Sequence, residues 1–596
     1  MAQQPISAYG LIGDMRTAAL VGLDGAIDWC CLPRFDSGSV FAAILDPERG
    51  GTWSIRPADA WKSTQRYVAR TNVLETTFEN GGGRVVLTDF MPVDANGRPS
   101  GERPEIHRRV RCTRGVVEMR MVFMPRFDYA SRSTRLEPLA GGLIATDRTD
   151  QVVTLTSAQP FQWSLEYGTA VTSFQVERGR DRWIVLRYDD DDVYPVDLYE
   201  SGEKLEVTTA FWQRWSAGVH YTGPYRSMVK RSALALKLLT HAGSGAIIAA
   251  PTTSLPETLG GSRNWDYRFV WLRDAAFTLE ALDAVGHHAE ADQFMRFLKR
   301  VCRHEGGKHL QIMYGIDGRR DLVERQLEHL SGYRNSRPVR IGNGAAGQLQ
   351  LDVYGEVLET ADRWRRHHGM SEGTWRVLRP LVDWVAGHWR QPDSGIWEVR
   401  NGPFHFTHSK VMCWVALDRA ARLADRGELP AAPAPRWRRE ADAIRAFVDT
   451  QCWSEALGSY TRTAGSGDVD ASLLMLPLVE YPDPGGRRIG GIIDAVNRLL
   501  RNGDVVYRYH AEDGVPGGEG CFLNCSFWLA GALARCGRVA EATALMDRLV
   551  GRANDVGLFA EEIDPATGAF LGNFPQALVH LALIDAAIAI SQSAAA

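Results

Sequence analysis

The sequence of 596 residues lacks the features that mark membrane, secreted or nucleic-acid-binding proteins. No apolar run approaches the ~18–20 residues of a transmembrane helix. The N-terminal segment does not combine a basic start with an apolar stretch, so no secretory signal is expected. The net charge of −4, from 68 Lys and Arg against 72 Asp and Glu, gives no strong attraction to nucleic acid or anionic lipid. We therefore expect no nucleic-acid partner and no membrane partner.

Cysteine is scarce, with nine residues, an odd number, scattered through the chain. Most lie in apolar surroundings, where a reduced cysteine behaves as a small hydrophobic residue. Cys521 and Cys525 are four positions apart, but no pair of His or Cys nearby completes a zinc site. The acidic run 189–192 lacks the spaced ligands and the glycine of a calcium loop, which favours a solvated turn. We expect a reducing, cytoplasmic compartment and no metal.

Up to about residue 200 the chain has the period and composition of β-strands. Asp24-Gly25 separates two such runs and is a signal for a two-residue hairpin. Along residues 117–123 apolar and polar side chains mostly alternate, as in a half-buried strand. The other runs that are typical of strands are 18–23, 26–32, 84–93 and 183–188. This pattern predicts an antiparallel β-sandwich.

From about residue 225 onward, apolar residues recur at helical spacing. Residues 282–291 and 533–542 share a pattern in which a helix stops at a glycine and Glu-Ala opens the next helix after three residues. Repeated helical hairpins are typical of a closed (α/α)6 barrel or an open solenoid. The predicted helices are 227–240, 274–285, 290–302, 348–366, 374–389, 408–424, 437–447, 489–501, 522–536, 541–550 and 575–591.

The loops between these helices favour the barrel. They are long, irregular and rich in Trp, Arg, Asp and Gly, whereas a solenoid needs short, regular repeats. Loops of this kind, gathered at one end of a barrel, commonly carry chemistry. We expect a multidomain β + α chain: a β-sandwich domain over 1–205, a linker helix or segment over 206–224, and an (α/α)6 catalytic barrel over 225–596.

Two distant segments place a carboxylate among turn-forming, aromatic and amide residues. Glu398 follows Trp397 in the run 393–400, and Glu561 precedes the run 571–576. A pair of carboxyl groups, one protonated and one ionised, is the minimum equipment for cleaving a glycosidic bond. Shielding of Glu398 by the Trp397 ring would raise its pKa, which suits a general acid. The alternative is an exposed glutamate that pairs with Arg400.

Residue chemistry alone does not rank the remaining carboxylates. Glu561 and Glu562 are adjacent, so only one of them is expected to face a pocket. Glu519 lies in a turn-rich loop and is a further candidate. Whether Glu562 or Glu519 shares the role of base stays open.

A third segment carries Trp271, Arg273 and Asp274 where a helix is expected to begin. One interpretation makes Asp274 the N-cap of that helix and Arg273 its surface neighbour. The other makes them a clamp for a sugar, in which Asp274 accepts from hydroxyls, Arg273 donates and the Trp271 ring stacks on the sugar.

Several long runs together resemble glycoside hydrolase family 15, the glucoamylase-like family, and within it the bacterial trehalase branch. The resemblance covers nearly the whole chain. The runs that carry it are 9–14, 25–37, 250–257, 263–268, 329–344 and 571–576.

The resemblance implies an N-terminal β-sandwich, a C-terminal (α/α)6 barrel and hydrolysis of an α-glucosidic bond with inversion. By its motifs, Glu398 is the general acid and Glu561 the general base. Trp271, Arg273 and Asp274 are then expected to bind the glucose being released, and Arg508 resembles a further sugar-binding arginine of the family. The implied chemistry needs no cofactor and no metal.

One departure bears on the substrate. Glucoamylases have an acidic residue directly after the catalytic acid, where this chain has Val399-Arg400. That loss argues against starch-like substrates. Tyr333, Arg337 and Asn343 belong to a segment rich in Arg and Asn, which we expect to recognise a second glucose joined 1,1. The predicted partner is therefore trehalose, a small disaccharide, and a homo-oligomer is compatible with the sequence.

Three alternatives remain open at this point. An α-glucosidase of the same family could act on maltose, isomaltose or short glucans. An inverting disaccharide phosphorylase would use phosphate in place of activated water and would need no carboxylate base, so Glu561 argues against it if Glu561 faces the pocket. A non-catalytic sugar-binding protein would be expected to have lost one of the two carboxylates.

Overall fold

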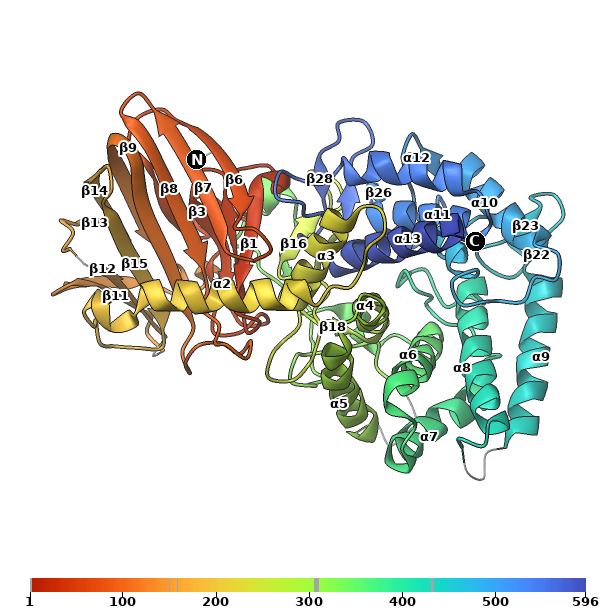
Figure 1. Cartoon of the computed structure of the whole chain (residues 1–596). Coiled ribbons are helices and arrows are strands. Elements are labelled where there is room, and N and C mark those ends of the chain that lie inside the picture. The colour runs from red at the N-terminus through yellow and green to blue at the C-terminus, as the bar shows by residue number, and fades with distance from the viewer. Residues whose placement is uncertain (1–2, 150, 158, 305–309, 430–432, 596) are drawn as a thin grey trace.

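The structure, a computed structural model, describes residues 3–149, 151–157, 159–304, 310–429 and 433–595. A part built of strands lies beside a part built of helices (Figure 1). Helix α2 (Ser201–Ala217) runs along the strands toward the helices and spans the predicted domain boundary at residue 205. The last strand of the first part ends at Tyr188.

The N-terminal part is one continuous antiparallel network of strands. Its central member is β9, which pairs with β8 and β15 along its first half and with β5 and β14 along its second half. The strands are β1 (Tyr9–Gly13), β2 (Ala18–Gly22), β3 (Ala26–Cys31), β4 (Ser39–Phe41), β5 (Thr52–Pro57), β6 (Lys62–Tyr67), β7 (Leu74–Asn80), β8 (Gly83–Phe90), β9 (Glu105–Met124), β10 (Arg135–Leu139), β11 (Gly142–Thr146), β12 (Val152–Ser157), β13 (Ser164–Glu166), β14 (Thr169–Glu177) and β15 (Asp181–Tyr188).

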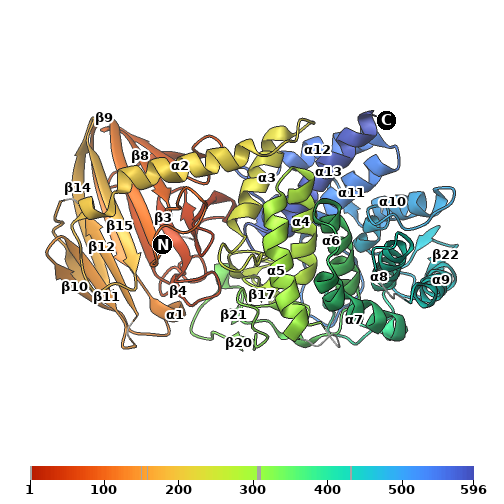
Figure 2. The same cartoon turned by 60° about the horizontal axis from the view of Figure 1, so that its bottom comes forward.

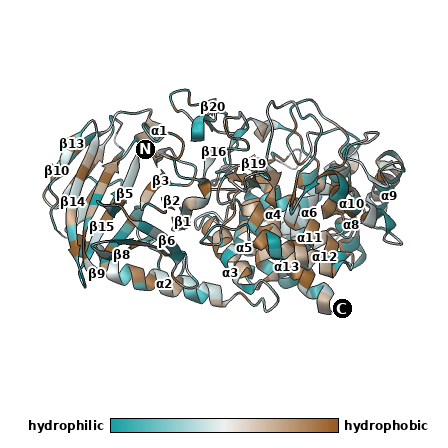
Figure 3. Ribbon diagram, turned by 90° about the horizontal axis from the view of Figure 1, so that it is seen from above, coloured by the Kyte–Doolittle hydropathy of each residue, from teal (hydrophilic) through white to brown (hydrophobic). Residues whose placement is uncertain are grey.

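Sequence period explains these strands. In the second half of β9, Val117, Met119, Met121 and Phe123 are buried while Glu118 between them is exposed, as the alternation predicted. Figure 3 shows apolar and polar residues interleaved along the strands. The predicted hairpin is confirmed, because β2 and β3 pair antiparallel around a turn. Its glycine has φ +75°, a conformation that favours glycine.

Each of the eleven predicted helices is present, with ends within four residues of the prediction. They are α3 (Arg226–Leu238), α4 (Leu272–Ala284), α5 (His288–His304), α6 (Asp352–His368), α7 (Glu372–His388), α8 (Thr407–Asp425), α9 (Ala434–Gln451), α10 (Arg487–Leu499), α11 (Leu523–Arg535), α12 (Val539–Val550) and α13 (Ala577–Ala595). Short strands lie in the loops: β16 (Thr253–Pro256), β17 (Asn264–Asp266), β18 (Val270–Trp271), β19 (Met313–Tyr314), β20 (Arg325–Gln326), β21 (Arg340–Ile341), β22 (Trp453–Ser454), β23 (Ser459–Tyr460), β24 (Arg501–Asn502), β25 (Val505–Val506), β26 (Cys521–Phe522), β27 (Glu562–Ile563) and β28 (Phe570–Leu571).

The inner helices contact one another in a ring. Helix α4 packs against α6, α6 against α8, and α8 against the short 3-10 helix η5 (Ala471–Met475). The ring continues from η5 to α11, from α11 to α13, and from α13 back to α4. Helices α5, α7, α9 and α12 pack outside these, and Figure 2 shows α4, α5, α6, α7 and α8 side by side. The sequence pattern did not predict η5, since it is too short to show a helical period.

Helix α13 corrects one expectation from composition. Its window Ala577–Ala594 is the one stretch in the described residues that is long and apolar enough to cross a membrane, with a mean hydropathy of 1.6. The sequence expectation that no apolar run approaches that length is wrong here. In the structure 67% of the window is buried, and α13 packs against α3, α4, α11 and α12. An all-round apolar helix in this position is the core of the helical part.

Candidate active site

One pocket gathers side chains from the loops that lead into the inner helices. Arg273 and Asp274 lie in the first turn of α4, whereas Glu398 precedes α8. The other walls come from the loops before α4, α11 and α13, so the amino ends of several inner helices face the same space. The lining residues are Ala249, Glu257, Arg263, Trp265, Tyr267, Trp271, Arg273, Asp274, Ile396, Trp397, Glu398, Arg400, Arg508, Asp513, Val515, Phe522, Glu561, Gln576 and Leu578.

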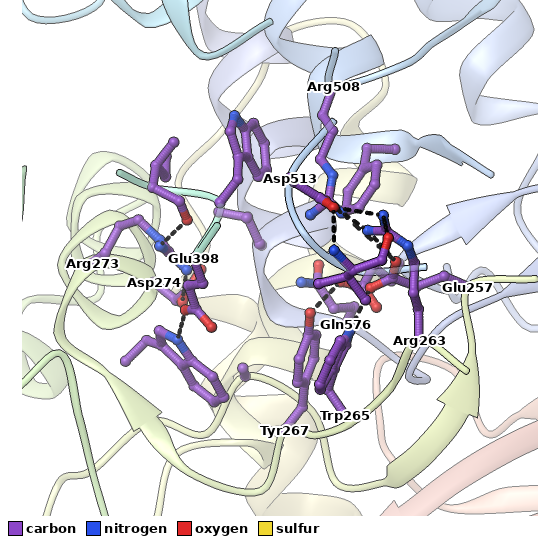
Figure 4. A pocket seen from close by; sticks show the side chains of 18 of the residues that line it. Glu257, Arg263, Trp265, Tyr267, Arg273, Asp274, Glu398, Arg508, Asp513 and Gln576 are labelled. Carbon is purple, nitrogen blue, oxygen red and sulfur yellow. Dashed lines mark hydrogen bonds and ion pairs between the residues drawn. The ribbon is translucent and has the colours of Figure 1, made fainter. Parts of the chain in front are cut away.

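Figure 4 shows the labelled side chains in two groups across the pocket. Glu398, Arg273 and Asp274 lie on one side. Glu257 and Arg263 lie on the other, together with the remaining acidic and basic labelled residues. Carboxyl groups therefore approach the same space from opposite walls.

Glu398 is oriented by Trp271 and by its own backbone. The Trp271 indole N–H donates to Glu398 Oε1 at 2.7 Å. Glu398 has φ +60°, a left-handed conformation that is uncommon and costs free energy for a residue with a Cβ. Burial raises the pKa of its carboxyl, partly offset by the nearby Arg273 guanidinium. A buried carboxyl with a raised pKa can donate a proton.

Arg273 and Asp274 are not a surface pair. Both are buried, and Arg273 Nη1 donates to the Ile396 carbonyl at 2.8 Å while Nη2 donates to Asp274 Oδ2 at 3.1 Å. Trp271 occupies the N-cap position of α4, and no side chain caps the helix. The capping interpretation of Asp274 is therefore wrong. Its Oδ1 has no protein partner and lies in the wall of the pocket, where it can accept from a bound hydroxyl.

Trp397 lies next to Glu398 in the pocket wall and is itself held by a hydrogen bond and by ring contacts. Its indole N–H donates to Asp470 Oδ1 at 2.9 Å. Its ring lies 5.7 Å from that of Phe522 and 6.1 Å from that of Trp528, measured between centroids. The ring forms part of the pocket wall next to Glu398, an arrangement compatible with the predicted shielding from water.

Glu561 is buried in the pocket wall, and both of its carboxylate oxygens accept hydrogen bonds. The Tyr267 hydroxyl donates to Glu561 Oε1 at 2.6 Å, and the Asn573 backbone N–H donates to Oε2 at 3.4 Å. Burial and the neighbouring Glu257 carboxylate raise the pKa of Glu561 to about 8. The pKa of Glu257 is itself raised, to about 7, mainly by burial. Two carboxyls in one poorly solvated space resist being ionised together.

Glu562 and Glu519 do not line the pocket. Glu562 begins β27, where successive side chains point to opposite faces, and its Oε2 accepts from the Gly520 N–H at 2.6 Å. Burial and the nearby carboxylates raise its pKa. Glu519 is paired with Arg508, whose Nε lies 2.9 Å from Glu519 Oε2. Geometry therefore ranks Glu561 first among the candidates for the base.

A network of arginines and carboxylates forms the opposite wall. Arg263 donates from both terminal nitrogens to Asp513, at 2.8 and 2.9 Å. Burial alone would raise the pKa of Asp513, but the hydrogen bonds from Arg263 and Tyr509 and from a backbone N–H lower it to about 2. Arg508 is buried and faces Glu257 at 3.7 Å. These fixed charges leave this side of the pocket polar and rigid.

Three predicted substrate-binding residues lie outside the pocket. The Tyr333 hydroxyl donates to the Gln4 carbonyl at 3.1 Å, so this side chain joins the loop to the N-terminal segment. Arg337 is exposed, and Asn343 accepts from the Ala345 N–H at 2.9 Å as the cap of a short 3-10 helix. Richness in Arg and Asn was the only sequence signal for this segment, and a loop's composition does not fix which way its side chains point.

Among the lining residues that the sequence did not single out are Glu257, Arg263, Trp265, Tyr267 and Asp513. Four of them fall within or beside the runs 250–257 and 263–268, which carry the family resemblance, so their charge and aromaticity were visible. Trp265 has a clear structural role, because its indole N–H donates to Glu257 Oε1 at 2.8 Å. The guanidinium of Arg340 lies 4.6 Å from its ring centroid.

The donor set at the pocket suits a sugar better than a metal ion. Its carboxylates lie among guanidinium groups, which compensate their charge, and among indole rings. Polar atoms remain that can bind the hydroxyl groups of a sugar. Two groups of His and carboxylate residues in the described chain are close enough to share a metal ion, and neither lies here. The arrangement can protonate a leaving oxygen from one wall and activate water from the other.

Comparisons with known proteins agree with this arrangement. The family model "Glycosyl hydrolases family 15" matches residues 223–588, and "Trehalase-like, N-terminal" matches residues 1–212. A trehalase of Mycobacterium tuberculosis is 39% identical over 98% of this chain and 89% of its own length. A trehalase of Thermoplasma volcanium is 36% identical over 98% of this chain and 93% of its own. The structure of a bacterial glucoamylase complexed with acarbose shares the fold, with a TM-score of 0.74 at 15% identity, over 100% of this chain and 94% of that chain.

The adjacent pair Glu561 and Glu562 offers a matched test of the base. We expect Glu561→Gln to lower the rate of glycoside hydrolysis by ~10²–10⁴-fold, because the amide cannot accept a proton from water. Glu562→Gln should lower it far less, because Glu562 points out of the pocket. Steady-state kinetics of both purified variants, with circular dichroism to check folding, distinguish the roles. The reverse order of effects would move the base by one residue.

Proposed function

The chain belongs to glycosyl hydrolases family 15, and from this premise we propose that it hydrolyses trehalose to two molecules of glucose. The observation that carries the proposal is the pocket, in which Glu398 and Glu561 approach one space from separate loops. Relatives named trehalase match over nearly the full chain, including the strand-rich part as well as the helical part. The chain is thus a glycoside hydrolase of the inverting type.

We propose the finer architecture on the same basis. The ring of inner elements α4, α6, α8, η5, α11 and α13, with other helices outside it, supports an (α/α)6 barrel in which η5 takes the place of one inner helix. The division of β9 between two sets of partner strands supports a β-sandwich, in which one long strand passes from one sheet to the other.

The acid step begins at Glu398. Burial favours the neutral form of its carboxyl, which donates its proton to the glycosidic oxygen as the bond to the anomeric carbon breaks. The hydrogen bond from Trp271 to Oε1 fixes the orientation of the carboxyl group in the pocket wall. Trp271 therefore orients the acid through its indole N–H; stacking of its ring on the sugar stays a prediction.

The new bond at the anomeric carbon is formed by a water molecule. In the ionised state Glu561 accepts a proton from a water molecule, and the water oxygen bonds to the anomeric carbon on the face opposite Glu398. The glucose on which attack occurs is released with inverted configuration, and the other glucose leaves with its configuration unchanged. In inverting enzymes the two carboxyl groups are ~6.5–9.5 Å apart, which leaves room for this water. Tyr267 holds Glu561 in place by donating to Oε1.

The sugar groups are held by both walls. Asp274 Oδ1 is free to accept from a hydroxyl of the glucose under attack, and Arg273 fixes the Asp274 carboxylate by donating to its other oxygen. Arg508 and Trp265 lie across the pocket from Glu398 and Asp274, where we place the second glucose. Because Tyr333, Arg337 and Asn343 do not line the pocket, we assign recognition of the second glucose to Arg263, Arg400 and Trp265, which do.

The residues of the pocket support the alternative functions less well than they support trehalose hydrolysis. A phosphorylase needs no carboxylate base, whereas Glu561 lines the pocket and is held there by two hydrogen bonds. A non-catalytic binding protein would not need an acid in a strained backbone conformation opposite a second carboxyl group. An α-glucosidase acting on maltose or isomaltose would use the same two carboxylates and differs only in the second wall. We also propose a reducing compartment, since eight of the nine cysteines are buried and behave as small apolar side chains.

The substrate is tested with a panel of glucose disaccharides. We expect kcat/KM for trehalose to exceed that for maltose and isomaltose by at least roughly tenfold, which corresponds to ~1.4 kcal/mol of transition-state binding. Initial rates of glucose release, measured with and without inorganic phosphate, give this comparison. A preference for maltose or isomaltose would keep the mechanism and overturn the substrate. Formation of glucose 1-phosphate would overturn hydrolysis.

The pH dependence tests the coupling between Glu257 and Glu561. Activity requires ionised Glu561, so kcat/KM should fall as the pH drops through the pKa of Glu561, which is raised to about 8. Glu257→Gln removes the neighbouring negative charge, which lowers that pKa and moves the acidic limb of the profile to lower pH. The glutamine Oε1 can still accept from Trp265.

The control for this experiment is Glu512→Gln, an exposed glutamate of the loop before α11. Its pH profile should match that of the wild type. An acidic limb that stays in place in Glu257→Gln, or moves to higher pH, would show that Glu257 does not set the pKa of the base.

A further inference from the structure

A cluster of two histidines and one aspartate lies away from the pocket. Asp283, His288 and His367 each offer a ligand atom, and these atoms all lie within 4.8 Å of one another. Asp283 lies near the end of α4, His288 begins α5, and His367 lies near the end of α6. The two imidazole rings are 4.2 Å apart between centroids. His367 Nε2 is 3.5 Å from one oxygen of Asp283, while the other oxygen contacts His288 Nδ1.

His287 and His368, the sequence neighbours of His288 and His367, contact other residues. His287 stacks on the Trp215 ring of α2, with centroids 3.8 Å apart and planes 6° apart. His368 stacks on Trp364, and its Nε2 lies 3.4 Å from Asp292. In each His-His pair, therefore, one ring is held by a tryptophan. The other, His288 or His367, is left to face Asp283.

We propose that Asp283, His288 and His367 form a binding site for a divalent transition-metal ion, with zinc as the best match. Zinc is commonly bound by imidazole nitrogen and carboxylate oxygen, and three protein ligands leave a coordination position for water. Hard cations such as magnesium prefer oxygen ligands alone, so they match this donor set less well. The side chains are 22%, 43% and 46% exposed for Asp283, His288 and His367, so a metal ion can reach them from solvent.

The second cluster of potential ligands does not compete with this one. It consists of Asp190, Asp191 and Asp192, in the acidic run that the sequence favours as a solvated turn. Asp190 is already neutralised by Arg103 and Arg187, each at 2.8 Å. Cationic partners lower the affinity of a carboxylate for a metal ion. The Asp283 cluster contains no such arginine contact among the ion pairs of the described residues.

The position of the site gives it a structural role. Helices α4 and α6 are neighbours in the inner ring, and their amino ends carry Asp274 in the pocket and Asp352 among the buried acids. The metal ion would join the opposite ends of the same two helices and the turn into α5. At 1.5 Å per residue, Asp274 and Asp283 lie ~14 Å apart along α4, so the ion touches no reacting atom. Its expected effect is on stability and not on the chemical step.

Metal binding is tested on the full-length protein without an affinity tag, after removal of metal by a chelator. We expect isothermal titration with zinc chloride to show one tight equivalent, and the melting temperature to rise with zinc until it saturates. In His367→Ala, zinc affinity should fall at least ~10-fold and the zinc-dependent rise should disappear. Cobalt(II) bound to the wild type should give visible absorption bands that His367→Ala lacks.

The matched control is His368→Ala, the next residue on α6, whose ring stacks on Trp364. It should keep wild-type zinc binding. Hydrolysis of trehalose by metal-free wild type and by His367→Ala should proceed at the same rate, which separates this proposal from the proposed function. Zinc binding that is equally strong in His367→Ala, or absent from the wild type, would overturn the site.

Discussion

The pocket depends on the burial of several carboxyl groups, which removes much of their hydration. Burial raises the pKa of Glu398 and of Glu561, and the Glu257 carboxylate raises that of Glu561 further. Nearby arginines oppose this rise, because Arg273 lowers the pKa of Glu398 and Arg508 lowers the pKa of Glu561. This balance of desolvation and charge determines at which pH one carboxyl group is protonated while the other is ionised.

The helical part supplies the rigid frame for that balance. The pocket residues lie in loops that precede inner helices or in the first turn of such a helix, so their positions are fixed by helices that pack in a ring. Arg273 links two of these elements, since it belongs to α4 and donates to the carbonyl of Ile396 in the loop before α8. The amino ends of helices also favour negative charge nearby, which suits a wall of carboxylates.

Much of this could be predicted from the sequence, because periodicity fixes secondary structure and local motifs fix the loops that carry chemistry. The helices, the hairpin at Asp24-Gly25 and the alternation along β9 follow directly from residue spacing. The direction of a loop side chain does not, which is why the predictions for Tyr333 and Asn343 placed them at a pocket they do not reach. Contacts between distant segments, such as Tyr267 with Glu561, leave no local signal.

The stereochemistry of trehalose cleavage tests the central claim most directly. Both glucose units of trehalose have the α configuration at the 1,1 bond, and proton NMR distinguishes α-glucose from β-glucose before they interconvert. Attack by water from the Glu561 side, opposite Glu398, predicts equal early amounts of the two anomers, because one unit is inverted and the other is released unchanged. Early release of α-glucose alone would show retention and contradict the assignment of Glu561 as base.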